Sequence, residues 1–341
     1  MPSPLGANIN TGVLFGLSGL DERSNDPEQR VVQVGAGLRW RDVYSYLDEY
    51  NVTVVGGRVL DVGVGGLILG GGLSYLSNLY GLVCDNVANF QLSSLPVVLW
   101  STPTDHHMKT SFGPSKAERT TLVRVFNLSC FFFDNSRPLG IVTAFTLYTY
   151  PIHLVWGGVK TCSLENLPRL ITAAYEFQQS DAAEEGYANF MLQAFMAGEM
   201  IGAVMNMVYL QPEPNPSAFA PFASIPTVID LTRIQTLTEM MSGQGLPANH
   251  CWNWAATSST PNITLYNALP GIITTSQGFR TLNSIPNGVL ALGFQPISSR
   301  ARHDAYVPYI FMNDASWDQD VFTSYGDDSV ARLRGIRTEY W

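Results

Sequence analysis

The fold is decided by the stretch Gly56-Gly57-Arg58-Val59-Leu60-Asp61-Val62-Gly63-Val64-Gly65-Gly66-Leu67-Ile68-Leu69-Gly70-Gly71-Gly72, which we call the glycine run. Glycine has no Cβ, so it adopts positive φ without strain and lets backbone N–H groups approach a ligand closely. Several such N–H groups in sequence form a concave nest for an anion, and a diphosphate can use many of them at once. A glycine-rich turn that serves only close packing is an equally good interpretation of the composition.

Two familiar phosphate-binding motifs do not fit the glycine run. A P-loop requires Lys and then Ser or Thr after its last glycine, whereas Gly70 is followed by two further glycines. A dinucleotide-binding fingerprint of the Rossmann type requires a third glycine at the position of Ile68. Asp85 lies at a suitable separation in sequence from the glycine run to be the acidic residue that binds a ribose. However, it follows Cys84 rather than an obvious strand. Any nucleotide would therefore be bound in a different way.

Length and composition allow one large domain or two ordinary ones, with a sizeable core. The chain has 341 residues, of which 46% are hydrophobic. The 19 basic and 28 acidic residues give a net charge of 19 − 28 = −9. This charge argues against nucleic acid or an anionic membrane as the main partner. The longest apolar stretch, 190–210, is interrupted by Gln193, Glu199 and Asn206, which favours two strands joined by a tight turn over a membrane helix.

Metal and disulfide chemistry have little support in the sequence. The cysteines form no CxxC pair, so isolated buried thiols are expected at Cys84, Cys130, Cys162 and Cys251. His106 and His107 have no acidic or cysteine residues at ligand spacing, which favours a solvated loop and no metal. Residues 1–6 contain neither a basic nor an apolar segment, so no signal peptide is expected.

The remaining local patterns predict a mixture of strands and helices. Strands are expected over 31–34 and over 145–150. A helix after the first strand is expected to bury one face, formed by Val43, Tyr46, Leu47 and Tyr50. Two further helices are expected over 166–177, with Pro168 in the first turn, and over 327–337.

The residues around the glycine run carry a resemblance to a known family. The run continues into Leu73-Ser74-Tyr75-Leu76-Ser77 and, shortly afterwards, Tyr80-Gly81-Leu82-Val83-Cys84-Asp85-Asn86-Val87. Together these segments closely resemble the vanillyl-alcohol oxidase / para-cresol methylhydroxylase (PCMH-type) flavoprotein superfamily. Within it they are most similar to the berberine-bridge-enzyme-like, FAD-linked oxidoreductases of fungal type. Supporting resemblance lies in residues 7–14, 32–37, 140–147, 309–317 and 324–333.

The resemblance implies an α+β fold in two parts, with FAD as the cofactor. Residues 1–150 would form an FAD-binding PCMH-type domain. Residues 151–305 would form a substrate domain, in which helices cover an antiparallel sheet. Residues 306–341 would return to the FAD-binding domain.

The resemblance also implies which residues contact FAD. The pyrophosphate and flavin would be lined by Gly63, Gly65, Gly66, Leu67, Gly70, Gly71 and Ser74. The same wall would continue through Tyr80, Gly81, Asn86 and Val87. The adenine side would lie near Gly140, Ile141 and Val142, and Asn313 would approach the flavin ring.

The activity implied is that of a flavin oxidase. A small organic substrate, bearing an alcohol or an amine, would give a hydride to the flavin, and O₂ would accept the electrons. A role in secondary metabolism would be consistent with the resemblance. No catalytic base can be chosen from the sequence: four tyrosines are candidates, and packing is the simpler interpretation of Tyr187, Tyr209, Tyr306 and Tyr309.

Three departures from the family pattern bear on function. The family's Ser-Gly-Gly-His loop, whose His often bonds to the flavin, would end at about residues 2–6, so an N-terminal truncation is expected. Val59 stands where some members carry a linking Cys, so any FAD is expected to be non-covalent. Residues 93–138 lack the family's strand, turn and helix pattern. The alternative function is therefore a truncated remnant, or the product of a misassigned gene sequence, that does not retain FAD.

Overall fold

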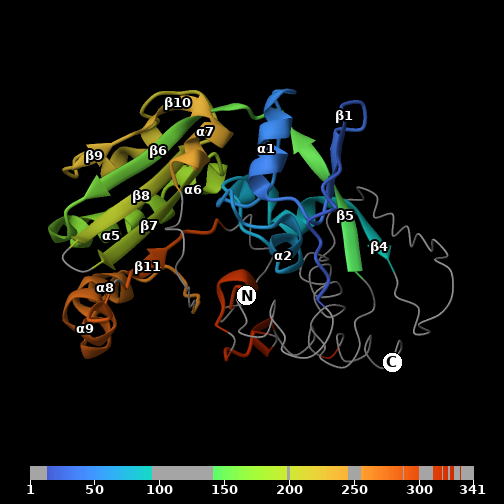
Figure 1. Cartoon of the computed structure of the whole chain (residues 1–341). Helices are drawn as coiled ribbons and strands as arrows, with labels where there is room; N and C mark the ends of the chain where they lie inside the picture. Colours follow the sequence, from blue (N-terminus) through green and yellow to red (C-terminus); the bar gives the residue numbers. More distant parts are fainter. Residues whose placement is uncertain are drawn as a thin grey trace.

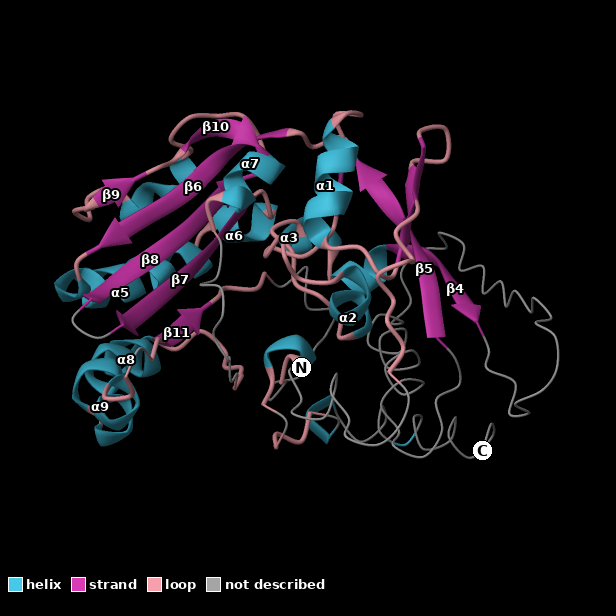
Figure 2. Cartoon of the chain, in the orientation of Figure 1, coloured by secondary structure: helices cyan, strands magenta, loops and turns pink. Residues whose placement is uncertain are grey.

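Two antiparallel sheets and their helices make up the part of the chain that the computed structural model describes (Figure 1, Figure 2). The described residues are 14–93, 141–197, 200–244, 255–286, 288–298, 310–316, 318–321, 323–325 and 331. Helices and antiparallel strands together confirm the α+β class. Residues 94–138 of the atypical segment lie outside the described residues, and so do all but one of the residues of the helix expected over 327–337.

The first sheet is built on β5 (Ile141–Tyr150), which pairs with three other strands. Its partners are β2 (Val31–Gly35), β3 (Thr53–Val54) and β4 (Val87–Ser93), and β1 (Arg23–Asp26) pairs with β2. Alternate residues of the central strands point into the core, where Val32, Val34, Phe145 and Leu147 are fully buried. The strands expected over 31–34 and 145–150 are thus confirmed.

Helix α1 (Trp40–Asp48) packs on this sheet, and its buried face differs from the expected one. The residues that it buries are Trp40, Val43, Tyr44 and Leu47. The prediction for Tyr50 is wrong, because the helix ends at Asp48 and the Tyr50 side chain is 41% exposed. The chain then turns at Asn51, which has a φ of 55°. Tyr46 is half-buried, and its hydroxyl accepts a hydrogen bond from the Asn25 N–H at 3.1 Å.

Three short helices follow along the chain. They are α2 (Val64–Leu69), α3 (Ser77–Tyr80) and the 3-10 helix η1 (Val83–Asn86). The end of the glycine run is bonded to η1: the Val83 N–H donates to the Gly72 carbonyl at 2.9 Å, and the Cys84 N–H donates to the Gly71 carbonyl at 3.0 Å. These bonds fix the turn between α2 and α3 as part of the folded core.

The second sheet has the order β10-β6-β8-β7-β11, with β9 also paired to β6. Its strands are β6 (Leu154–Cys162), β7 (Ala188–Ala197), β8 (Met200–Tyr209), β9 (Ile229–Asp230), β10 (Arg233–Thr236) and β11 (Leu290–Phe294). Strands β7 and β8 form an antiparallel hairpin, which confirms the two strands expected within 190–210. Within the described ranges, no helix has the length and apolar character needed to cross a membrane.

Several helices lie beside the second sheet, and α5 covers one of its faces. They are η2 (Leu164–Asn166), α5 (Leu167–Gln178), α6 (Asp181–Glu185), η3 (Ser217–Phe222), α8 (Ile263–Thr275) and α9 (Gln277–Asn283). Helix α5 has Pro168 in its first turn, as the sequence predicts. Its Phe177 packs edge-on against Phe190 of β7, with ring centroids 5.1 Å apart.

Residues of α3 and of helix α7 (Leu237–Ser242) join the two sheets. The buried Asn78 of α3 donates from Nδ2 to the Ala188 carbonyl of β7 at 3.2 Å. Its Oδ1 accepts from the Ser298 N–H at 3.2 Å. Apolar side chains of α7 belong to the core under the first sheet. The C-terminal segment adds the 3-10 helices η5 (Met312–Asp314) and η6 (Thr323–Tyr325).

Candidate functional site

The glycine run begins where the chain passes the indole of Trp40. A Cβ on Gly56 would lie 2.4 Å from Cζ3 of Trp40, and a Cβ on Gly57 would lie 2.5 Å from its Cδ1. Both distances are far inside the 3.5–4.0 Å separation at which carbon atoms attract one another. Close packing against a fully buried indole therefore requires these two glycines.

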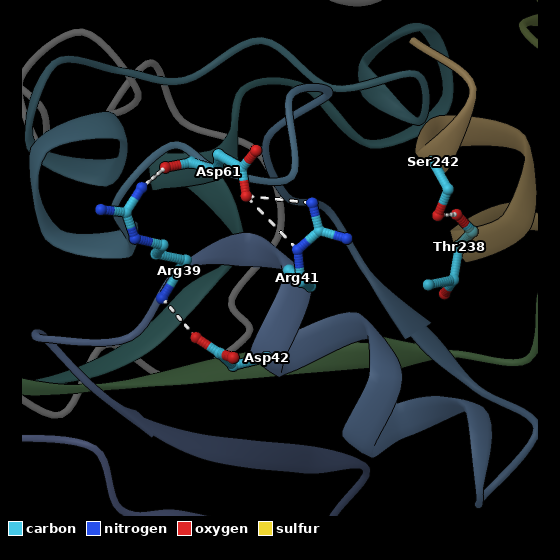
Figure 3. A network of polar contacts seen from close by, with 6 residues as sticks. All are labelled: Arg39, Arg41, Asp42, Asp61, Thr238 and Ser242. Carbon is cyan, nitrogen blue, oxygen red and sulfur yellow. Dashed lines mark hydrogen bonds and ion pairs between the residues drawn. The ribbon is translucent and has the colours of Figure 1, made fainter. Parts of the chain in front are cut away.

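Charged residues fix the chain just before α2 (Figure 3). The Arg39 backbone N–H donates to Oδ2 of Asp42 at 3.0 Å, and the Arg39 guanidinium donates to the Asp61 carbonyl. Arg41 forms an ion pair with the Asp61 carboxylate at 3.0 Å. The Arg41 and Asp61 side chains are 52% and 64% exposed, so this pair orients the segment and contributes little to stability.

Two glycines at the end of the run are packed against other parts of the protein. A Cβ on Gly70 would lie 2.5 Å from Nδ2 of Asn313. Gly72 has a φ of +76°, and its Cβ would lie 2.6 Å from Cβ of Val83. Any larger residue at either position would displace a neighbour, so packing explains both glycines.

The other glycines of the run differ in what surrounds them. Gly65 faces inward, because its Cβ would lie 3.2 Å from the Ala36 carbonyl oxygen. Gly71 has a φ of +104°, which favours glycine. Gly63 and Gly66 have no described atom within 4 Å of an added Cβ. Among the described residues, nothing fills the space beside the backbone at these two positions.

Asn313 of η5 ties the C-terminal segment to the glycine run. Its Oδ1 accepts from the Gly72 N–H at 3.0 Å. Its Nδ2 lies 3.4 Å from the Gly66 carbonyl oxygen and 3.3 Å from that of Leu67. One side chain thus contacts both ends of the turn after α2. These contacts make Asn313 a support for the loop, and its approach to the flavin ring stays a prediction.

The predicted contact residue Asn86 has partners within the protein. Its Nδ2 donates to the carbonyls of Tyr80 and Leu82 at 3.0 and 2.8 Å, and its Oδ1 accepts from the Tyr150 hydroxyl. The Tyr80 and Tyr150 rings stack with centroids 3.9 Å apart. Burial raises the pKa of both phenols, so they keep their protons at neutral pH. Gly81 has a φ of +82° in the turn after α3.

Ser74 is also engaged internally, since its Oγ accepts from the Gly56 N–H at 3.3 Å and from the Leu76 N–H at 3.2 Å. The other predicted residues are buried or half-buried hydrophobic side chains, namely Leu67, Val87, Ile141 and Val142. The Ala36 N–H donates to the Thr143 carbonyl at 2.9 Å, which brings this end of β5 beside the inward side of α2. Gly140 lies outside the described residues.

A cluster of polar side chains around Arg58 was not found from the sequence. Arg58 Nη1 lies 2.7 Å from Oε1 of Gln295, and its guanidinium lies 5.9 Å from the centroid of the Tyr75 ring. The Tyr75 hydroxyl donates to Oε1 of Gln244. Burial raises the pKa of Tyr75 to about 12. A cation within the glycine run was the signal that could have marked this cluster.

Cys84 and Cys162 are buried free thiols, as the sequence predicts, and burial raises the pKa of each. Cys130, Cys251, His106 and His107 lie outside the described residues. Among the residues that are described, no group of three or more His, Cys, Asp or Glu side chains could hold a metal ion.

Two of the four candidate tyrosines can be placed. Tyr187 and Tyr209 are half-buried neighbours with ring centroids 6.3 Å apart, an arrangement that packing explains. Tyr306 and Tyr309 lie outside the described residues.

Comparison with known proteins begins with the glycine run itself. Residues 2–94 match the family described as FAD binding domain. The match contains the whole run and the Tyr80–Val87 segment. It ends beside the start of the segment 93–138, whose sequence departs from the family pattern.

Curated fungal proteins are similar to most of this chain. FAD-dependent monooxygenase FUP4 of Fusarium proliferatum is 26% identical over 402 residues, which cover 98% of this chain and 74% of FUP4. FAD-dependent monooxygenase prx3 of Penicillium roqueforti is 31% identical over 255 residues, which cover 73% of this chain and 46% of prx3. The aligned part thus amounts to about half of prx3 and three quarters of FUP4.

Solved structures share the fold. 6-Hydroxy-D-nicotine oxidase from Arthrobacter nicotinovorans superposes with a TM-score of 0.68 at 18% identity, covering 98% of this chain and 81% of that one. Physcomitrella patens BBE-like 1 gives 0.61 at 15% identity, covering 93% and 77%. The VAO-type flavoprotein MtVAO615 from Myceliophthora thermophila gives 0.60 at 14% identity, covering 95% and 68%. Residues 2–94 thus belong to the FAD binding domain family, with FAD as the cofactor, and the described residues have the fold of the vanillyl-alcohol oxidase / para-cresol methylhydroxylase and berberine-bridge-enzyme-like flavoproteins.

Proposed function

We propose that this chain holds FAD non-covalently along the open side of the glycine run and oxidises a small organic substrate by hydride transfer to the flavin, with O₂ as the electron acceptor. The observation that carries the proposal is the open space beside Gly63 and Gly66. Packing or a positive φ explains the other glycines of the run, whereas the described part of the structure gives these two neither reason to lack a side chain.

The residues around this open side fit a dinucleotide cofactor. Without a Cβ at Gly63 and Gly66, a flat or anionic ligand can approach the backbone closely. The same backbone is held by Asn313 and by its bonds to η1, so the ligand would not have to order it. Leu67 of α2 is half-buried and would form the part of the wall beside Gly66.

The reaction class follows from the cofactor and from the relatives. When bound, FAD supplies the hydride acceptor that amino-acid side chains lack. The chain would contribute binding and orientation, with the glycine run as the cofactor wall. The similar proteins are named monooxygenases and oxidases, and both kinds of enzyme consume O₂. This common property supports O₂ as the acceptor.

Two matched leucine substitutions test the site. Gly66→Leu places a side chain in the open space, and leucine is a good helix former in α2. Gly278→Leu makes the same change at another open helical glycine, in α9. In titrations followed by flavin fluorescence, we expect G66L to bind FAD at least roughly tenfold more weakly than wild type, because the new side chain occupies the ligand's space. G278L should bind as wild type does.

Wild-type affinity in G66L would refute the placement of FAD beside Gly66. Failure of the wild-type chain to bind FAD would overturn the proposal and support the alternative of a chain that does not retain it.

The same preparations show whether the flavin is attached covalently. Val59 stands where some members of the family carry a linking Cys, and it cannot form a bond to the flavin. Acid precipitation should therefore release all flavin to the supernatant, and flavin in the pellet would reveal a covalent bond.

A further inference from the structure

The second sheet has a face that α5 does not cover, and Met191 of β7 lies on it. Phe190 and Leu192 of the same strand belong to the core between the sheet and α5. Successive residues of a strand point to opposite faces, so Met191 and Gln193 lie on the other face. Both side chains are half-buried rather than buried. A small molecule can therefore reach the Met191 thioether.

Met191 differs in exposure from the other methionines whose side chains the structure describes. Those five are between 1% and 9% exposed and lie in the two cores. They are Met196, Met205, Met207, Met240 and Met241. Oxidation to the sulfoxide requires contact between the sulfur and the oxidant, so it favours the accessible thioether. Within this set, Met191 is the methionine that a dissolved oxidant would reach.

Two N–H donors converge on the sulfur of Met191. Nη1 of Arg58 lies 3.8 Å from Sδ, and Nε2 of Gln193 lies at the same distance of 3.8 Å. A thioether is a weak acceptor, so neither donor gains a strong hydrogen bond from it. An oxygen bound to this sulfur would carry more negative charge and accept from both donors. The surroundings of Met191 therefore suit its sulfoxide better than its thioether.

The guanidinium of Arg58 has capacity for such an oxygen. The three ion pairs found among the described residues involve other cations. Burial raises the pKa of Asp314, and the Arg58 charge opposes this effect. One of the five N–H groups of Arg58 donates to Oε1 of Gln295 at 2.7 Å, which orients the guanidinium. Since Arg58 belongs to the glycine run, it also places Met191 beside the proposed cofactor wall.

We propose that Met191 is a modification site, at which hydrogen peroxide oxidises the thioether to the sulfoxide. The sulfur bonds to one peroxide oxygen while the O–O bond breaks, and the departing oxygen takes the proton of the transferred one and leaves as water. Sulfur is oxidised by two electrons, and the peroxide is reduced by two. Arg58 stabilises the negative charge that develops on the departing oxygen. Afterwards Arg58 and Gln193 donate to the sulfoxide oxygen.

The proposal rests on the proposed function for its oxidant, because O₂ that accepts two electrons and two protons becomes hydrogen peroxide. The modification replaces an apolar thioether by a polar, chiral sulfoxide on the uncovered face of the sheet, and methionine sulfoxide reductases can reverse it. The state of Met191 would thus record how often the neighbouring flavin has been reoxidised.

Peptide mapping by mass spectrometry tests the reactivity of Met191 in the full chain. The folded protein is treated at neutral pH with hydrogen peroxide labelled with heavy oxygen, so that oxidation during sample handling is not counted. Met191 should be oxidised at least roughly tenfold faster than the five buried methionines. Arg58→Gln should slow this oxidation by roughly 2- to 30-fold, because a neutral donor replaces a charged one. Arg58→Lys should keep part of the rate.

Arg280→Gln, at an exposed arginine of α9, is the matched control and should behave as wild type. Oxidation of Met191 no faster than that of the five buried methionines would overturn the proposal. A variant R58Q that merely loosened the packing would expose the sulfur and speed up its oxidation. An equal or faster rate in R58Q would therefore overturn the role of Arg58.

A second experiment tests the source of the oxidant. FAD-loaded protein is reduced with dithionite without air and then reoxidised by air, with catalase present to destroy peroxide that escapes. Met191 should be oxidised in this protein and not in FAD-free protein treated in the same way. No oxidation here, with the reaction towards added peroxide intact, would overturn the flavin as the source. Failure to bind FAD, read from flavin absorbance, would overturn the proposed function and leave the reactivity of Met191 standing.

Discussion

Burial decides the chemistry of several individual side chains. Cys84 is 3% exposed, and burial raises the pKa of its thiol well above the usual value, with Asp85 adding to the effect. A thiol that keeps its proton is a poor nucleophile. Cys84 therefore acts as a small packing residue, although it lies within the Tyr80–Val87 segment that carries the family resemblance.

The raised pKa of Cys84 makes stability depend on alkaline pH. In the unfolded chain a cysteine loses its proton near pH 8.5, while the folded protein keeps it, so the unfolded state binds fewer protons and stability falls as pH rises above about 8.5. The slope is at most about 1.4 kcal/mol per pH unit for this group. Urea unfolding at pH 7.5 and 9.5 measures it. Cys84→Ala should lower stability at both values but show a shallower fall, and equal slopes would contradict the expectation.

At the scale of elements, helix α2 depends on its neighbours. It has six residues, too few for an isolated helix to be stable in water. The Val64 N–H donates to the Leu38 carbonyl at 2.9 Å and secures its beginning. Asn313 secures the turn after it, through Gly72. The proposed FAD wall is therefore assembled from segments that are far apart in the sequence.

Removal of the Asn313 side chain should loosen the turn and leave the start of α2 in place. In Asn313→Ala we expect hydrogen exchange at the Gly72 amide to become roughly 2- to 12-fold faster, because one net hydrogen bond of about 0.5–1.5 kcal/mol is lost. The Val64 amide, bonded to Leu38, is the internal reference and should be unchanged. Exchange measured at single residues by NMR decides the matter. Unaltered protection of Gly72 would show that its bond to Asn313 has little weight.

Local patterns predicted the elements in which packing against the rest of the protein imposes a regular spacing of apolar and polar residues. The hairpin within 190–210 was predictable because polar residues interrupt an apolar stretch. The buried face of α1 was only half predictable, since the period of Val43 and Leu47 was continued to Tyr50 beyond the end of the helix. The contact of Trp40 with Gly56 depends on tertiary packing, and no local period encodes it. For the same reason the roles of individual glycines in the run required the structure.

For the whole molecule, a small number of buried polar contacts join the two sheets. Asn78 is 3% exposed and bonds both to Ala188 of β7 and to Ser298 beyond β11. The core under the first sheet also contains side chains of β6, β8 and α7. The two halves therefore share apolar and polar contacts, which favours unfolding as one unit.

Asn78→Leu tests this junction. Leucine has a similar volume but leaves the Ala188 carbonyl and the Ser298 N–H without the bonds that Asn78 provides. At about 1–3 kcal/mol for each buried group, we expect a loss of roughly 2–6 kcal/mol in the free energy of unfolding, measured in urea by circular dichroism. Asn267→Leu, at an exposed position of α8, should change it by less than about 0.5 kcal/mol. Equal stability of the two variants would show that Asn78 does not hold the halves together.

The candidate site was predictable as a region and less so as a set of roles. The glycine run and the Tyr80–Val87 segment lie together, as the resemblance implies. Asn86 and Ser74, however, are occupied by internal hydrogen bonds. The polar contact of Arg58 could not be predicted, because its partner Gln295 follows β11 and lies 237 positions later in the chain. Side chains that are far apart in the sequence and meet only in the folded protein form no motif of fixed spacing that could be recognised.

The contact between Asn313 and Gly72 also has a consequence in time. The two residues are 241 positions apart in the chain. A ribosome adds about 5–20 residues per second, so the Gly72 amide waits roughly 12 to 48 seconds after its own synthesis before Asn313 exists. During that interval the nascent chain contains the glycine run without the hydrogen bond between the Gly72 N–H and Asn313. The turn beside the proposed FAD wall therefore cannot gain this hydrogen bond until Asn313 has been synthesised, well after the glycine run itself.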